Sequence, residues 1–185
     1  MESLMTPLAR LILLLVMSLT TQAHAAGAPE ALRGKSVVLA WTETRQQRVV
    51  GQPNFYSVNG SDSTSIYVST AGRIFVRRTN STRAGSGTVE RAPGEGSGAY
   101  PKGTVLFGGQ TMTLIGETKG GAYRTVIEFD ANFVSCTARR AIAFQSGKTS
   151  IALSPIIHKY VEVKSVTVSG MSCSVKAGNV LAGAT

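Results

Sequence analysis

The segment Tyr123-Arg-Thr-Val-Ile-Glu-Phe-Asp-Ala-Asn-Phe-Val-Ser-Cys136-Thr-Ala-Arg-Arg-Ala-Ile-Ala-Phe144 has the pattern of two β-strands joined by a turn. Every second residue from Tyr123 to Phe129 points one way and the residues between them point the other, which is the period of a half-buried strand. Asp130-Ala-Asn132 supplies turn chemistry, because short Asx side chains bond their own backbone and tolerate tight bends. A second strand then carries Cys136 back, so the segment predicts a β-hairpin that holds one half of any disulfide in the chain.

Further strands are expected on both sides of this hairpin. The stretch Ser36–Thr42 places Val37, Leu39 and Trp41 on one face, and a polar continuation follows it as far as Arg48. The other expected strands comprise residues 65–69, 73–78, 104–107, 110–115, 149–153, 160–168 and 171–175. No window shows convincing helical periodicity.

Glycine, proline and asparagine mark the expected turns. Asn59-Gly60 is the strongest short hairpin signal, since a type I′ turn needs positive φ at both central residues. Pro155 is expected to stop one strand, and Gly170 is expected to end the strand of residues 160–168. From about residue 79 to 103 the alternation stops, which predicts a long mobile Gly/Ser-rich loop in which Thr88–Glu90 can form a brief strand.

Short strands at regular spacing with Gly-rich turns predict an all-β fold. We expect a single antiparallel β-sandwich or small β-barrel. A barrel of the outer-membrane class is not expected, because its lipid face needs apolar bands with aromatic girdles. This chain is 6% aromatic and scatters Arg and Lys through its strands.

The first 25 residues have the features of a cleaved signal peptide. Arg10 precedes an apolar run from Leu11 to Leu19, and Ala23-His24-Ala25 has small residues at the two positions that a signal peptidase recognises. The run is about half of the ~20 residues that a transmembrane helix needs. We therefore expect cleavage after Ala25, one domain over residues 26–185 with a flexible lead-in over 26–34, and a periplasmic or secreted location.

Cys136 and Cys173 are the two cysteines of the chain, and both lie after the predicted leader. Two cysteines in an exported chain most simply form one disulfide, with two buried free thiols as the alternative. Together with His158, the one histidine after the leader, they make a poor ligand set for zinc. No metal or other cofactor is expected.

The stretches Phe129–Cys136, Gly170–Val175 and Gly178-Asn179 resemble small exported proteins of alphaproteobacteria that have no assigned function. The resemblance covers roughly Gly121–Gly183 and rests on short motifs. It implies export and a paired cysteine, which the residues indicate independently, and it implies no activity.

The sequence shows no convincing catalytic constellation. His158 would have to serve as the base of any Ser-His or Cys-His mechanism. Glu43 with Glu128 or Glu162 is one acid pair available for glycoside hydrolysis, but nothing in the sequence selects these residues. Ser146–Thr149 resembles the end of a phosphate-binding loop but joins two expected strands. An envelope hydrolase is therefore the least favoured of three functions.

Positive charge is the most informative surface feature. The formal charge is +9, and it is unchanged after the leader because Glu2 and Arg10 cancel. Such charge attracts polyanions, which for an exported protein are envelope polysaccharide, lipopolysaccharide or phospholipid headgroups. Specific nucleic-acid binding is not expected, because no recognisable module is present. The candidate polyanion-binding residues are Arg73, Arg77, Arg78, Arg83, Arg139, Arg140 and Lys148.

A non-enzymatic exported domain that docks on anionic envelope material is the favoured function, and a solvated surface without a dedicated partner is its plain alternative. The second function is a small β-barrel that holds an apolar ligand. Its candidate lining residues are Trp41, Phe75, Phe107 and Tyr123. The oligomeric state does not follow from the sequence.

Overall fold

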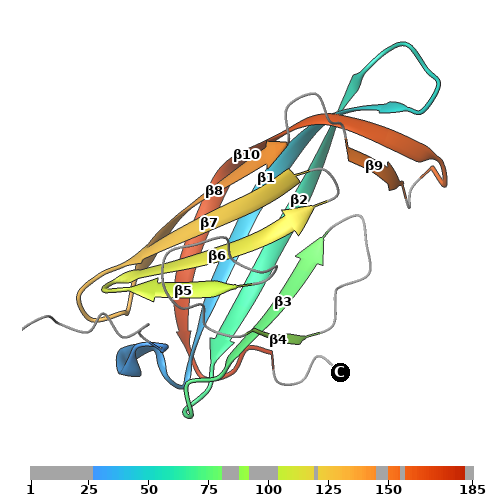
Figure 1. The fold of residues 1–185 in the computed structure, drawn as a ribbon. Coiled ribbons are helices and arrows are strands. Elements are labelled where there is room, and N and C mark those ends of the chain that lie inside the picture. Colours follow the sequence, from blue (N-terminus) through green and yellow to red (C-terminus); the bar gives the residue numbers. More distant parts are fainter. Residues whose placement is uncertain are drawn as a thin grey trace, which may run out of the picture.

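The structure is a computed structural model, and it describes residues 27–80, 88–91, 104–118, 121–144, 150–154 and 157–181. The predicted signal peptide, Arg83 and Lys148 lie outside these ranges, as does most of the long loop expected at about 79–103. The described chain forms ten strands and one short 3-10 helix, η1 (Glu30–Leu32). The expected all-β fold is confirmed, and Figure 1 shows its strands in two antiparallel sheets with a sandwich-like arrangement.

The larger of the two sheets, here the long sheet, has six strands. Their order is β4 (Val89–Arg91), β3 (Ile74–Asn80), β2 (Tyr56–Val68), β1 (Lys35–Val49), β10 (Tyr160–Ala177) and β9 (Ser150–Leu153). The short sheet has four, in the order β5 (Val105–Gly108), β6 (Thr111–Thr118), β7 (Gly121–Phe129) and β8 (Cys136–Phe144). The brief strand expected around Thr88–Glu90 is therefore present as β4.

The β7–β8 hairpin has the predicted alternation. Thr125, Ile127 and Phe129 are buried, whereas Arg124 and Glu128 are exposed. The turn between the strands is held by Asp130, whose Oδ1 accepts hydrogen bonds from the backbone N–H groups of Val134 at 2.8 Å and Ser135 at 3.3 Å. These bonds favour the ionised carboxylate, so the pKa of Asp130 lies below its usual value.

Strand β1 runs without a break from Lys35 to Val49. The prediction of a turn at Asn59-Gly60 is wrong. Gly60 and Asn59 lie inside β2, opposite Glu43 and Thr44. The hydroxyl of Thr44 donates a hydrogen bond to Asn59 Oδ1 at 2.9 Å, so the polar part of β1 finds partners that keep β2 extended. The chain turns earlier, between Val49 and Tyr56.

Gly170 does not end a strand as expected. It lies inside the 18-residue strand β10 with a φ of +61°. Ala40 faces Ser172 and Thr42 faces Ser169, so two residues of β10 stand against Trp41 alone. This is a β-bulge with glycine in the left-handed conformation, which bends and twists the strand while the ladder continues.

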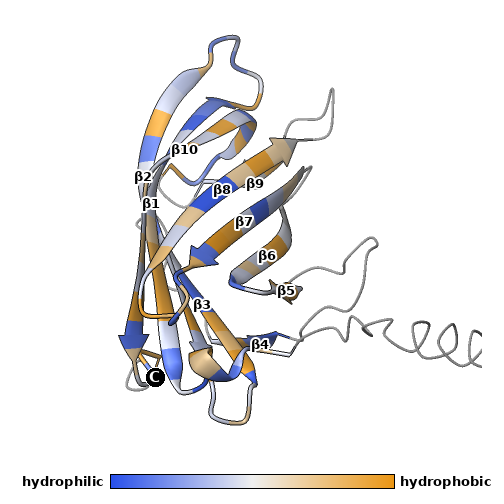
Figure 2. Cartoon of the chain, turned by 90° about the vertical axis from the view of Figure 1, so that its left-hand side faces the viewer, coloured by the Kyte–Doolittle hydropathy of each residue, from blue (hydrophilic) through white to orange (hydrophobic). Residues whose placement is uncertain are grey.

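The core lies between the sheets. Its members include Val37, Leu39 and Trp41 of β1, Ile66 and Val68 of β2, and Met112 and Ile127 of the short sheet. Figure 2 shows the two layers side by side, with hydrophilic and hydrophobic colour alternating along the strands. Within the described residues no helix is long and apolar enough to cross a membrane.

The predicted disulfide between Cys136 and Cys173 is confirmed. It joins β8 of the short sheet to β10 of the long sheet, with Cα atoms 5.5 Å apart. Nearby, Lys35 Nζ donates a hydrogen bond to the carbonyl oxygen of Phe133, at 3.2 Å. The two sheets are thus held together along the β8–β10 side. A disulfide also fits an oxidising compartment outside the cytoplasm.

Candidate binding pocket between the sheets

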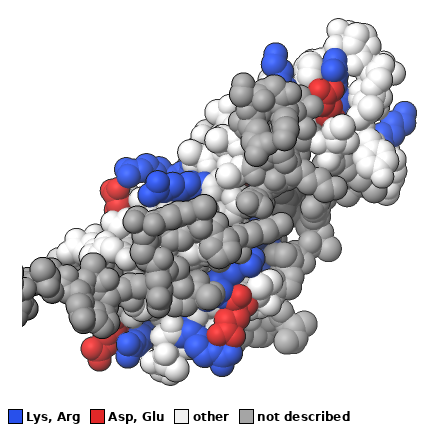
Figure 3. Space-filling model, in the orientation of Figure 1, with Lys and Arg blue, Asp and Glu red and all other residues white. Residues whose placement is uncertain are grey.

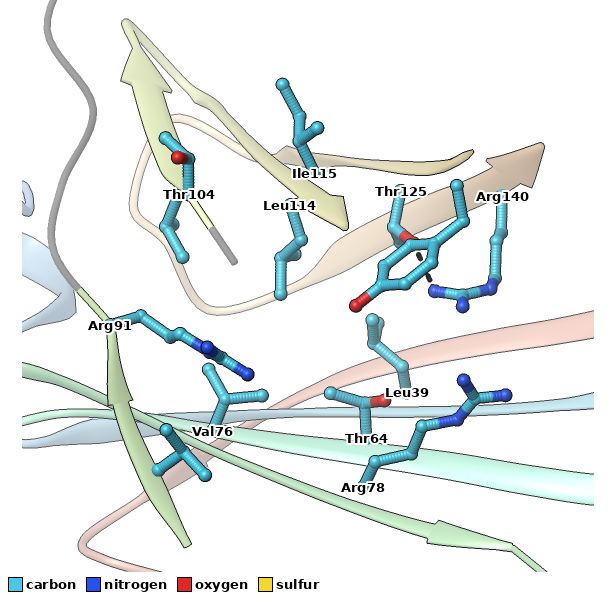
Figure 4. A pocket seen from close by; sticks show the side chains of 13 residues that line it. Leu39, Thr64, Val76, Arg78, Arg91, Thr104, Leu114, Ile115, Thr125 and Arg140 are labelled. Atoms are coloured by element: carbon cyan, nitrogen blue, oxygen red, sulfur yellow. Dashed lines mark hydrogen bonds between the residues drawn. The ribbon is translucent and has the colours of Figure 1, made fainter. Parts of the chain in front are cut away.

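A pocket of about 230 Å³ lies between the two sheets. The long sheet contributes Leu39, Thr64, Val76, Arg78, Val89 and Arg91, and the short sheet with the residue before it contributes Thr104, Val105, Leu114, Ile115, Tyr123, Thr125 and Arg140. Six of these thirteen residues are aliphatic, three are threonines, three are arginines and one is a tyrosine. Figure 4 shows side chains of both sheets converging on this space.

Strand geometry selects which arginines reach the pocket. Successive side chains of a strand point to opposite faces, so each of the two Arg-Arg pairs in the sequence is divided. Arg78 and Arg140 face inward and line the pocket. Arg139 faces the opposite way and pairs with Glu128 at 3.0 Å on the exposed face of the short sheet. Arg77 donates to the carbonyl oxygen of Val180 at 3.4 Å.

The guanidinium of Arg140 lies between two aromatic rings. Its carbon is 4.0 Å from the ring centre of Tyr123 and 4.8 Å from that of Trp41. Nη1 donates a hydrogen bond to Thr125 Oγ1 at 2.8 Å (Figure 4). The Nε atom is buried and has no hydrogen-bond partner among the described residues. Arg140 therefore has an unused donor beside the pocket.

The environment of Arg140 disfavours its charge. Burial, and to a lesser degree the positive charge of Arg78, lowers its pKa to about 10. The guanidinium is still protonated at neutral pH. A buried cation that lacks a full set of partners costs stability, and a bound anion would offset that cost.

A network of buried charges borders the pocket on the long sheet. Glu43 accepts hydrogen bonds from Arg45 Nη2 at 2.7 Å, Arg78 Nη2 at 3.1 Å and Trp41 Nε1 at 3.1 Å. Asp62 Oδ1 lies 3.0 Å from Arg78 Nη2, whereas its Oδ2 is buried without a hydrogen bond among the described residues. Arg78 is thus fixed by two carboxylates at the edge of the pocket.

The two carboxylates respond differently to this environment. Burial by itself would raise the pKa of Glu43, but hydrogen bonds from Arg45 and Trp41, with the charge of Arg78, hold it below its usual value. For Asp62, burial outweighs the attraction of Arg78, and the charge of Glu43 acts with burial, so its pKa is raised. Glu43 is therefore the better anionic partner for the arginines.

Arg91 enters the pocket from β4 (Figure 4). Within the described part of the chain it forms no ion pair and no hydrogen bond from its side chain. Val76 and Val89 lie beside it in the lining. The pocket therefore has an apolar interior with cationic groups contributed by β3, β4 and β8.

The described polyanion-binding candidates do not form one group. Arg73 is exposed and forms two hydrogen bonds with Glu90, at 2.7 and 2.5 Å. In Figure 3 basic and acidic side chains appear together at several separate places on the visible face. Docking through the predicted set of surface arginines stays a prediction.

The four apolar-ligand candidates lie in different places. Tyr123 lines the pocket, and Trp41, 3% exposed, lies beneath Arg140. Phe107 packs against the core without lining the pocket. Phe75 lies on the opposite face of β3 from the pocket-lining Val76 and stacks on Tyr67, with ring centres 6.3 Å apart.

The candidate catalytic residues are spread over the molecule. His158 is exposed in the turn before β10. Glu43 faces the interior, Glu128 pairs with Arg139 on the outside of the short sheet, and Glu162 pairs with Arg48 at 2.6 Å. Within the described ranges, no group of three His, Cys, Asp or Glu residues is placed to hold a metal ion.

Sequence reasoning did not single out Arg45, Asp62, Thr125 or Arg91 as partners in one site. The inward alternation of β7 and β8 was a usable signal, because it places Thr125 and Arg140 on one face. Which residues of the long sheet stand opposite them depends on how the two sheets pack. Comparison of the chain with protein-family models, with curated proteins and with solved structures finds no match.

Proposed function

We propose that this chain is an exported, non-enzymatic binding domain whose ligand is a small amphiphile with an anionic head, held between the two sheets. The observation that carries the proposal is the Nε donor of Arg140, which is buried beside the pocket and has no hydrogen-bond partner among the described residues. Hydrogen bonds between a guanidinium and a carboxylate or phosphate are among the strongest in proteins, and they are commonly bidentate.

The charge balance around the pocket favours an anion. Arg45, Arg78 and Arg140 are accompanied by two carboxylates, Glu43 and Asp62, which leaves one positive charge. Arg91 adds a second at the other side of the lining. Because these groups are partly shielded from water, an anion bound between them interacts more strongly than it would at the surface.

The lining and the volume define the rest of the ligand. Leu39, Val76, Leu114 and Ile115 offer aliphatic surface. A volume of about 230 Å³ is below the ~300–1,000 Å³ of pockets for drug-sized ligands. A short-chain or aromatic carboxylate fits these limits, and a complete phospholipid does not.

Binding is favoured over catalysis because the described lining residues include no histidine, cysteine or carboxylate. A nucleophile and a base within hydrogen-bond reach of each other are the minimum for most hydrolytic mechanisms. The predicted signal peptide and the resemblance to small exported proteins support a role outside the cytoplasm.

Calorimetric titration tests this function. Hexanoate and benzoate are compared with hexanol and acetate, which lack the charge or the apolar part. Hexanoate or benzoate should bind, and Arg140→Met should weaken that binding by about tenfold to a hundredfold, as expected for the loss of a charge-assisted hydrogen bond.

Arg139→Met is the matched control. It removes the same side chain one residue earlier, on the opposite face of β8, where Arg139 is exposed. The control should bind as the parent does. Equal affinity of the Arg140 and Arg139 variants, or equal affinity for hexanoate and hexanol, would contradict an anion site at Arg140.

A further inference from the structure

A second feature lies far from the pocket, at the free end of the long sheet. Figure 1 shows β1, β2, β9 and β10 extending beyond the short sheet as an arm at the upper right. We define the arm as residues 46–57, 150–154 and 157–164. Five of the seven exposed large hydrophobic residues of the described chain are here: Val50, Tyr56, Ile151, Ile157 and Tyr160.

Strand pairing places most of these side chains on one face. Arg48 and Ile151 both stand opposite Glu162 in the ladders on either side of β10. The backbone N–H of Val50 donates to the carbonyl oxygen of Tyr160 at 3.0 Å, which sets these two residues side by side. Residues opposite each other in a ladder share a face, so the outer face of the arm carries Val50, Ile151 and Tyr160 as an apolar strip that adjoins the Arg48–Glu162 ion pair.

Basic groups flank this strip. The Phe55 ring centre lies 4.7 Å from the guanidinium carbon of Arg48 and 5.6 Å from Lys164 Nζ. Lys159 is exposed in the turn that also holds Ile157. Glu162 is the acid of the described arm and is paired with Arg48, which leaves the charges of Lys159 and Lys164 unbalanced. In Figure 3 blue side chains project around the end of the arm.

We propose that the arm docks on an anionic phospholipid bilayer, with the apolar strip entering the headgroup boundary and the basic side chains on lipid phosphates. Exposed apolar patches with polar rims mark interaction sites. Tyrosine favours the membrane interface because its ring is apolar and its hydroxyl group stays hydrated. Lysine and arginine lay their stems along apolar surface while their charged ends stay at the phosphates.

Charge complementarity selects this partner over a second copy of the chain. Two arms packed strip to strip would bring together two surfaces that each carry net positive charge, and like charges oppose such contact. An anionic bilayer attracts both Lys159 and Lys164. Each is worth roughly fivefold in affinity near the surface, so anionic vesicles should bind on the order of thirtyfold more tightly than neutral ones.

Vesicle co-sedimentation tests the proposal. Equimolar phosphatidylglycerol–phosphatidylcholine vesicles are compared with pure phosphatidylcholine. Every variant is produced from the full chain under the same conditions, so that the predicted leader is processed or retained equally in all. Tyr160→Ser should weaken binding to both vesicles, whereas Lys164→Glu should remove most of the preference for anionic lipid.

Two variants serve as matched controls. Val134→Ser removes an exposed apolar side chain, 61% accessible, from the β7–β8 turn, and Lys176→Glu reverses an exposed charge at the far end of β10. Both should bind as the parent does. The urea denaturation midpoint of each arm variant shows whether its fold is intact, independently of any ligand in the pocket.

Equal binding of the arm variants and their controls would overturn the proposal. Vesicle binding that does not depend on lipid charge would also overturn it. Concentration-dependent dimers that disappear with Tyr160→Ser, in the absence of vesicle binding, would assign the strip to a second copy instead. The pocket and the arm are separate, so failure of one leaves the other standing.

Discussion

Gly116 of β6 and Tyr123 of β7 are cross-strand partners, and the Tyr123 ring occupies the space that a side chain at position 116 would need. A Cβ added at Gly116 would overlap the ring atoms. The backbone of Gly116 is not in the left-handed region, so the requirement for glycine is steric. The glycine lets the ring lie flat over β6, where it supports the guanidinium of Arg140.

Gly116→Ala should therefore displace Tyr123 and disturb the Arg140 site. We expect a loss of about 1–3 kcal/mol in the free energy of unfolding, typical of overpacking, together with weaker hexanoate binding. Urea denaturation and calorimetric titration measure the two effects. Gly108→Ala is the control, because a Cβ there meets nothing within 4 Å. Equal behaviour of the two variants would show that Tyr123 moves aside freely.

The affinity for an anionic ligand should depend on pH through Arg140. Its pKa is lowered to about 10 by burial, so its charge is complete at pH 7 and is lost as the pH rises through 10. Hexanoate affinity should be flat between pH 6 and pH 8.5 and then fall. In Arg140→Met the step near pH 10 should be absent. A parent and a variant with the same profile would mean that other groups control binding.

The buried acids Glu43 and Asp62 should contribute unequally to stability. The pKa of Glu43 is lowered, so its ionised form stabilises the fold above its usual pKa, and this contribution is lost as the pH falls through the folded value. The pKa of Asp62 is raised, so its ionised form is the disfavoured one. At pH 7 we expect Glu43→Gln to cost about 3 kcal/mol and Asp62→Asn to cost about 1 kcal/mol or less.

Urea denaturation of both variants at pH 7 and at pH 4 measures this difference. The difference in the free energy of unfolding between the two variants should narrow on acidification, because the parent loses the contribution of Glu43 as that residue takes up a proton. A gap that widens at low pH, or an Asp62→Asn variant less stable than Glu43→Gln, would reverse the assignment of the two carboxylates.

The hairpin of residues 123–144 could be predicted because its signals are local. Alternation places Thr125, Ile127 and Phe129 inward, and Asp130 closes its own turn. The turn predicted at Asn59-Gly60 is wrong because a turn propensity is also local, and the pairing of β2 with β1 overrides it. The strand end predicted at Gly170 is wrong for the same reason, because this glycine forms a bulge inside a long ladder.

The pocket could not be derived from the sequence, because its parts come from strands that belong to different sheets. Alternation along β3 and β8 predicts that Arg77 and Arg78, or Arg139 and Arg140, point apart. It does not predict that the inward members meet across the interior beside Trp41. That meeting depends on the packing of one sheet on the other, for which no local pattern exists.

The disulfide gives the last prediction. It connects strands of different sheets across 37 residues of sequence, on the β8–β10 side of the sandwich. Loop-closure entropy for this span gives about 4 kcal/mol of stabilisation, so Cys136→Ser with Cys173→Ser should lower the free energy of unfolding by that amount. Because Arg140 lies on the same strand as Cys136, the double variant should also bind hexanoate more weakly. Reduction of the parent with dithiothreitol is the control and should match the double variant. A loss below about 1 kcal/mol would instead mean that core packing, with Lys35 bonded to Phe133, holds this side of the sandwich closed.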